Sequence, residues 1–265
     1  MRVLALLLAA CAALLPVACG SGPAAARPAL WVVRDADTTI WLFGTIHLLP
    51  PRVDWQGAPV GDAIAQADTL VTEIADGDPQ SQAATFLRLG RGQTSEPGVP
   101  AKYVALKPWA AALAISADAA RNVGATREDG VEAVLTAAFA ARQRQALESF
   151  EGQLRMFDGL PPGAQHRLLQ QSVVEARDPQ AAYARTFDAW RRGDEKSIAA
   201  SFDTLPGDLR DALIINRNRR WAAWIEERLA RRGKILVAVG AGHLVGTFGV
   251  PALLRNKGFK VTRVQ

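Results

Sequence analysis

Two of the three histidines in this 265-residue sequence occupy the same kind of position. His47 and His243 each follow an apolar run that is typical of a β-strand, and each stands three residues after a glycine, Gly44 or Gly240. A glycine there lets the backbone turn sharply or lets a ligand approach closely. Imidazole is a common ligand of Zn, Mn, Fe and Co, and it is the usual acid or base near neutral pH. The two motifs therefore predict a polar site that binds a metal ion.

The strands before the two histidines decide whether these side chains meet. Open α/β sheets place ligands beyond the carboxyl ends of their strands. If the two strands are neighbours, His47 and His243 point into the same crevice. Two unrelated structural histidines are the alternative, and the repeated motif in a chain so poor in histidine favours the shared site. The third histidine, His166, lies in a polar helical stretch, and we expect it to be exposed and outside the site.

Carboxylates supply the remaining candidates. Glu73 interrupts the apolar strand at residues 69–74, and a buried carboxylate is costly unless it is paired, hydrogen-bonded or bound to a metal. An exposed strand end is the alternative for Glu73. Glu148 follows a short apolar pair in the same manner. For Glu132 we favour the first turn of a helix, where a negative charge is stabilising.

The order of the expected elements predicts an α/β (α+β) fold. Its sheet is built from strands near both termini, and a large, mainly helical insertion spans about residues 80–232 of a single domain, residues 27–265. Expected strands cover residues 29–34, 39–43, 69–74, 146–148, 234–239 and 259–264. Expected helices cover residues 60–67, 81–89, 108–121, 131–144, 163–176, 180–192, 208–232 and 250–257.

The first 26 residues resemble a leader for export. Arg2 precedes an apolar run at residues 3–18 that is too short for a comfortable membrane span, and small residues follow it. Residues 17–20 resemble a lipoprotein processing site at Cys19, and ordinary cleavage near Ala26 is the alternative. Both readings place the domain in the periplasm or on the cell envelope, with a membrane contact only through a lipid. Because both cysteines, Cys11 and Cys19, lie in the leader, a disulfide scaffold and a thiolate metal site are excluded.

The net charge of +5 does not point to nucleic acid. Its late arginines are not interleaved with aromatic residues, as they are in proteins that bind single strands. We read most of them, including Arg219 and Arg220, as a solvated helix face.

Several segments together resemble the TraB/GumN family. They are residues 43–48 (FGTIHL), Thr72-Glu73, residues 146–148 with Gln153, Arg217-Asn218 with Trp221, residues 239–246 (VGAGHLVG) and residues 258–261. The resemblance covers nearly the whole mature chain. Glu132 departs from the Asp that the family often carries there.

The resemblance implies a fold shared with Tiki, erythromycin-esterase-like and ChaN-like proteins. Tiki proteins are metal-dependent proteases that use paired Gly-x-x-His motifs with a glutamate. His47, His243 and Glu73 are then the implied metal ligands for Mn, Co or Zn, with Glu148 and Arg217 in support. The remaining supporting residues are Gly44, Thr45, Gly240, Gly242 and Asn218.

The first hypothesis for function is thus a divalent-metal-dependent hydrolase of the cell envelope that acts on peptides or proteins. The metal would activate a water molecule, Glu73 or Glu148 would be the general base, and Arg217 would stabilise a developing oxyanion. The second hypothesis is an envelope protein that binds a peptide, a metal or a haem-like ligand without turnover. The oligomeric state is left open.

Overall fold

A six-stranded sheet forms the centre of the protein. The computed structural model describes residues 25–265, and the predicted leader, with Cys11, Cys19 and the expected lipoprotein processing site, includes residues outside this range. The strands are β1 (Leu30–Arg34), β2 (Thr38–Thr45), β3 (Thr69–Ile74), β4 (Gln143–Glu148), β5 (Gly233–Gly240) and β6 (Val261–Arg263). The predicted α/β class, with a sheet made from both ends of the chain, is confirmed.

The two strands that carry the Gly-x-x-His motifs are direct neighbours. The strand order is β4-β3-β5-β2-β1-β6. β5 runs parallel to both β2 and β3, and the ladder places Thr45 beside Gly240. β1 is antiparallel to β2 and β6. Both motifs therefore begin at the same edge of the sheet, as the sequence predicted.

Burial on both faces explains the apolar strands. Every β2 residue except Thr39 is buried, as are residues 235–239 of β5. Parallel strands covered on both faces read as continuous apolar runs. The β1–β2 turn is closed by Asp35, whose Oδ1 accepts from the Thr38 amide at 2.8 Å.

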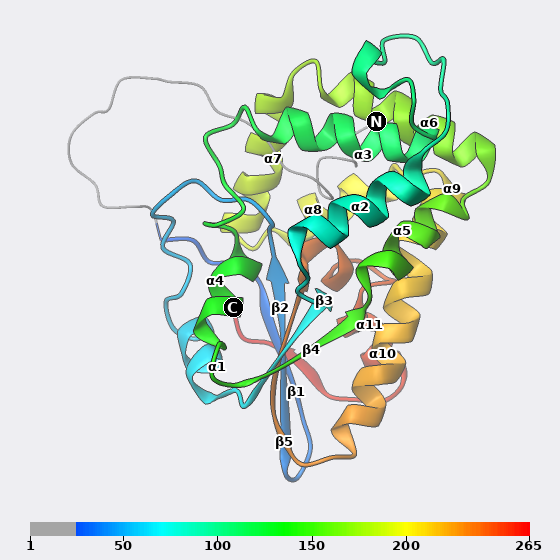
Figure 1. Ribbon diagram of the computed structural model, residues 1–265. Helices are drawn as coiled ribbons and strands as arrows, with labels where there is room; N and C mark the ends of the chain where they lie inside the picture. Colours follow the sequence, from blue (N-terminus) through cyan, green and yellow to red (C-terminus); the bar gives the residue numbers. More distant parts are fainter. Residues whose placement is uncertain (1–24) are drawn as a thin grey trace, which may run out of the picture.

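Helices surround the sheet and extend past its carboxyl edge (Figure 1). In Figure 1, α10 and α11 lie on one side of the sheet and α1 and α4 on the other, while the helices of the middle of the chain lie beyond the tip of β2. The α-helices are α1 (Val60–Gln66), α2 (Pro79–Gly90), α3 (Pro108–Ala120), α4 (Val131–Ala138), α5 (Phe150–Asp158), α6 (Pro162–Glu175), α7 (Pro179–Arg191), α8 (Glu195–Asp203), α9 (Gly207–Arg210), α10 (Asn216–Leu229) and α11 (Val250–Asn256). Two 3₁₀ turns, η2 (Ala101–Tyr103) and η4 (Ala241–Leu244), and a π-helix, η3 (Asp211–Ile215), complete the set.

The helices differ from the prediction in three places. The helix expected at residues 131–144 ends at Ala138, because residues 143–148 pair with β3 as β4. The helix expected at residues 208–232 is present as a continuous helical segment, in which the π-helix η3 lies between α9 and α10. The sequence reading missed α8, which begins where Asp194 accepts a hydrogen bond from the Ser197 amide at 3.1 Å.

Side chains from α7 connect the helical layer to the end of β2. The indole Nε1 of Trp190 donates to the Gly44 carbonyl at 2.8 Å, and the Tyr183 hydroxyl donates to the Leu48 carbonyl at 3.2 Å. Both bonds are buried, and they hold the loop that contains His47 from above the sheet. Within residues 25–265, no helix is long and apolar enough to cross a membrane.

Gly130, which precedes α4, tests how tightly this loop is packed. A Cβ atom at Gly130 would lie 2.1 Å from the carbonyl oxygen of His47, which is backbone and cannot swing away. We predict that Gly130→Ala lowers the free energy of unfolding by about 1–3 kcal/mol in urea titrations. Gly57→Ala is the matched control, because a Cβ there meets nothing within 4 Å. Equal stability of the two variants would contradict this packing.

Candidate functional site

The two Gly-x-x-His motifs touch each other at the carboxyl ends of β2 and β5. A Cβ atom on Gly44 would lie 3.2 Å from the Cα of Ala241, so a larger residue at position 44 would require the two loops to move apart slightly. From Gly240 the chain enters the 3₁₀ turn η4, which contains His243. The loop after β2 is held against the start of α4, because the Val131 amide donates to the Ile46 carbonyl at 3.2 Å.

A fully buried arginine stands at the centre of the site. Arg217 belongs to the buried face of α10 and has no exposed surface. Its Nη2 donates to Glu73 Oε2 at 2.8 Å and lies 3.0 Å from Glu148 Oε2, and its Nε donates to both Glu148 oxygens at 3.1 Å. Its Nη1 lies 3.1 Å from His243 Nε2 and donates to the Leu213 carbonyl at 3.4 Å. All three nitrogens of the guanidinium group are therefore occupied by groups of the protein.

This arrangement keeps the carboxylate of Glu73 ionised. Burial raises the pKa of Glu73, but the positive charge of Arg217, the two imidazoles and the Gly240 amide outweigh burial and lower the pKa to about 2. The Gly240 amide donates to Glu73 Oε1 at 2.6 Å. The carboxylates in turn raise the pKa of Arg217, against the effect of its burial. The alternative of an exposed strand end for Glu73 is wrong, since only 8% of this residue is exposed.

His243 is held as a neutral imidazole. Asn218 Nδ2 donates to the Phe248 carbonyl at 2.8 Å, which turns Asn218 Oδ1 toward His243 Nδ1 at 2.7 Å. We assign the ring proton to Nδ1, because Nε2 then accepts from Arg217. Burial lowers the pKa of His243 to about 3, and the charge of Arg217 acts in the same direction, against the opposite effect of Glu73.

His47 forms a second pair with Glu132. Its Nδ1 lies 2.9 Å from Glu132 Oε1, which also accepts from the Thr45 hydroxyl. The charge of Glu132 raises the pKa of His47 to about 9, although burial acts against it. Glu132 Oε2 is buried and has no hydrogen-bond partner among residues 25–265. The contact with Glu132 is made by Nδ1 of His47, so the pair holds the imidazole in place and leaves Nε2 available.

Most of the predicted site residues meet here. The contacts that Glu132, Trp221 and Arg220 make with them were not predicted from the sequence. Glu132 is in the first turn of α4 as expected, yet its side chain also holds His47. Trp221 packs on His243 with ring centroids 4.5 Å apart and donates from Nε1 to Glu148 at 3.2 Å. Arg220, read as a solvated residue, is exposed and also contacts Glu148 at 3.3 Å. A Cβ at Gly242 would lie 2.0 Å from the ring of Phe202, so this glycine serves packing.

The proposed metal ligands do not fit a divalent ion as they lie. His243 Nε2 and Glu73 Oε1 are 3.8 Å apart, but Arg217 occupies the lone pair of His243 and one oxygen of Glu73. Among the described residues, no group of three or more His, Cys, Asp and Glu side chains is arranged to hold a metal ion. The cation in contact with both candidate ligands is the guanidinium group of Arg217. The predicted metal remains an expectation that needs a direct test.

The fold and the site define an α/β protein with a buried Arg–Glu–His network at the carboxyl edge of its sheet. The model of the TraB/PrgY/gumN family matches residues 29–100 and 84–263, so this chain belongs to that family. Comparison with curated proteins and with solved structures gave no match.

Metal analysis of the purified protein shows whether the site binds a divalent ion or is filled by the guanidinium group of Arg217. We predict that the wild type and Arg219→Met take up no stoichiometric Mn, Co or Zn, because Arg217 covers the ligands. Arg219 is exposed on the same helix and serves as the matched control. Arg217→Met uncovers His243 and both carboxylates, and it should bind about one Zn per chain.

Arg217→Met also leaves two buried carboxylates without their partner, which costs about 3–5 kcal/mol. Circular dichroism with and without Zn therefore accompanies the metal analysis. If the variant does not fold, the number of metal ions bound per wild-type chain still decides between the two outcomes. One ion per wild-type chain, lost in His47→Ala, would contradict our reading and support the metal centre expected from the sequence.

Acid should weaken the fold through His243. Its pKa is lower in the folded protein, about 3, than the ordinary value of 6.5, so the unfolded chain binds the proton first. The contribution of neutral His243 to the free energy of unfolding is complete above pH 6.5 and is lost as the pH falls toward 3. The loss is about 2 kcal/mol by pH 4.5. Urea unfolding at pH 7 and 4.5 should show a smaller loss in His243→Gln than in the wild type. An equal loss in both proteins would mean that His243 is not held neutral.

Proposed function

We propose that this chain is a hydrolase of the bacterial cell envelope that acts on peptides, with His47 as its acid–base residue. The observation that supports the proposal most is the His47–Glu132 pair. Its geometry, 2.9 Å between Nδ1 and Oε1, is that of a base held by a carboxylate, with Nε2 left for a substrate. The envelope location rests on the leader expected at residues 1–26.

The charges of His47 and Glu73 suggest which side chain is the general acid and which is the general base. With a pKa of about 9, His47 carries a proton at neutral pH, so it can protonate a leaving group. Glu73 stays ionised and is the carboxylate that can take a proton from an attacking water. Glu148 is the alternative for this role, because both carboxylates already accept hydrogen bonds: Glu148 from Arg217, Arg220 and Trp221, and Glu73 from Arg217 and the Gly240 amide.

Arg217 supports this chemistry indirectly. Because its three nitrogens are engaged by the protein, we assign it the part of a positioning residue rather than a direct oxyanion donor. It holds Glu73, Glu148 and His243 in fixed geometry. A site fixed in this way loses little entropy when a substrate binds.

A metal-dependent hydrolase is the second candidate, and one observation favours it. Both imidazoles have Nδ1 held by an oxygen, of Glu132 for His47 and of Asn218 for His243. Metal-bound histidines usually show this second interaction. A metal could reach His243 only if Arg217 moved away from Nε2.

Cleavage of a mixed peptide pool, followed by mass spectrometry, tests the proposed function. His47→Ala should reduce the rate by about 10²–10⁴, because it removes the proton donor. Glu132→Gln should reduce it less, and exposed Arg219→Met should leave it unchanged. Rates should persist in a chelator, whereas loss in the chelator supports the metal-dependent form. Peptide binding with no new fragments would overturn the hydrolase and support the binding protein.

A further inference from the structure

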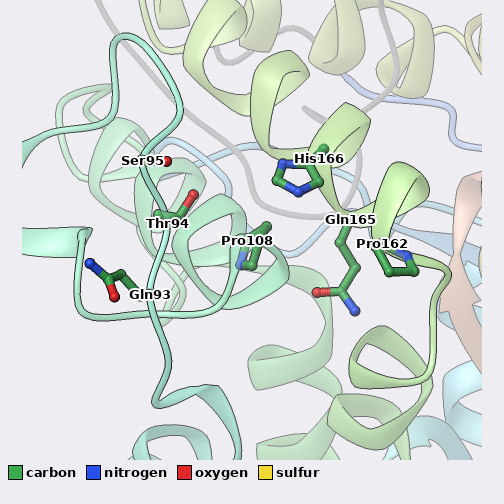
Figure 2. A pocket seen from close by; sticks show the side chains of 7 residues that line it. All are labelled: Gln93, Thr94, Ser95, Pro108, Pro162, Gln165 and His166. Carbon is green, nitrogen blue, oxygen red and sulfur yellow. The ribbon is translucent and has the colours of Figure 1, made fainter.

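A cavity lies in the helical layer, and none of its lining residues belongs to the site described above. Its volume is about 450 Å³. Residues of the loop between α2 and α3 line one side, and the first turns of α3 and α6 line the other (Figure 2). The lining residues are Gln93, Thr94, Ser95, Pro108, Pro162, Gln165 and His166.

Two long helices begin at this cavity without a side-chain cap. Pro108 is the first residue of α3 and Pro162 is the first residue of α6, and neither N-terminus has a side-chain cap hydrogen bond. The first backbone amide that donates a hydrogen bond in the opening turn is that of Ala111 in α3 and that of Ala164 in α6. The amides of Trp109, Ala110 and Gly163 therefore precede these bonds. Uncapped helix N-termini favour negatively charged oxygen atoms.

Thr94 gives an independent sign that the cavity takes a ligand. The residue is 6% exposed, and its hydroxyl is buried with no hydrogen-bond partner among residues 25–265. Figure 2 shows this hydroxyl directed toward the space between Thr94 and His166. The Thr94 amide, which donates to the Val104 carbonyl at 3.0 Å, fixes its place in the loop. A buried hydroxyl without a partner is costly, and a bound acceptor would satisfy it.

Both charged side chains near the cavity lie next to a carboxylate, although the buried Nδ1 of His166 has no hydrogen bond of good geometry among residues 25–265. Lys107 Nζ lies 2.7 Å from Asp158, and His166 Nδ1 lies 2.5 Å from Glu96. The amide nitrogen of Gln165 is used by two backbone carbonyls, of Asp158 at 3.2 Å and of Leu160 at 3.0 Å. Among the lining residues, Thr94 and Ser95 offer hydroxyl groups, and the free amides of Trp109, Ala110 and Gly163 directly follow the lining residues Pro108 and Pro162. Such donors suit one oxyanion group of a small molecule.

We propose that this cavity binds the phosphate or carboxylate group of a small organic molecule between the N-termini of α3 and α6, with the Thr94 hydroxyl as a donor. The helices supply a partial positive charge, and Thr94 and Ser95 supply hydroxyl groups at the loop side. The cavity is larger than a single phosphate needs, so the rest of the molecule extends over Gln93 and His166. This binding is independent of the hydrolase proposal.

Titration of the full mature chain with inorganic phosphate, followed by amide NMR at constant ionic strength, tests the proposal. Phosphate should shift the amides of Thr94, Trp109, Ala110 and Gly163, and chloride should not. Acetate and sulfate in parallel show whether a carboxylate or a phosphate-like ion is preferred. Thr94→Val should weaken phosphate binding about tenfold.

Thr94→Val also provides its own folding control, because removing an unpaired buried hydroxyl should leave Tm equal or higher. Thr204→Val removes an exposed hydroxyl outside the cavity and should bind phosphate as the wild type does. Absence of any phosphate-specific shift would overturn the proposal. Equal affinity of Thr94→Val and wild type, or shifts confined to residues around His243, would overturn it as well.

Discussion

The structure depends on the burial of one positive charge. Arg217 has no exposed surface, so the desolvation of its guanidinium group has to be offset by Glu73 and Glu148 within about 3 Å. A buried ion pair adds little net stability over apolar packing, but the loss of one partner is very costly. The network is therefore better explained by the position it imposes on its members than by the stability it adds.

That constraint joins parts of the chain that are far apart. Glu73 comes from β3, Glu148 from the end of β4, Arg217 from α10 and His243 from the turn after β5. Each lies at or near the carboxyl edge of the sheet, where parallel strands place ligands. His47 enters from the neighbouring strand β2 and is fixed by Glu132 of α4. Two imidazoles with opposite pKa shifts, to about 9 and to about 3, result from a paired carboxylate in one case and from burial beside a cation in the other.

Much of this architecture could be predicted from local pattern. Apolar runs identified the strands, and the repeated Gly-x-x-His identified His47 and His243 as residues of one edge of the sheet. The role of Glu132 could not be found this way, because a glutamate in the first turn of a helix looks the same whether or not it meets a histidine. The extent of β4 depends on its pairing with β3, and the π turn between α9 and α10 has no signal in the apolar pattern. For Arg217 a signal existed, since it shares the buried face of α10 with Trp221 and Ile225.

The position of Arg217 bears directly on the metal ion that the sequence predicts. Two histidines and a glutamate are a sufficient donor set in composition, yet a guanidinium group lies on two of the three donors. The most direct test is a crystal structure of residues 27–265 grown with Mn²⁺, with anomalous scattering used to locate the ion. Our account predicts no anomalous peak at His243 and a guanidinium group between Glu73, Glu148 and Nε2. A peak shared by His47, His243 and Glu73, with Arg217 displaced, would contradict it.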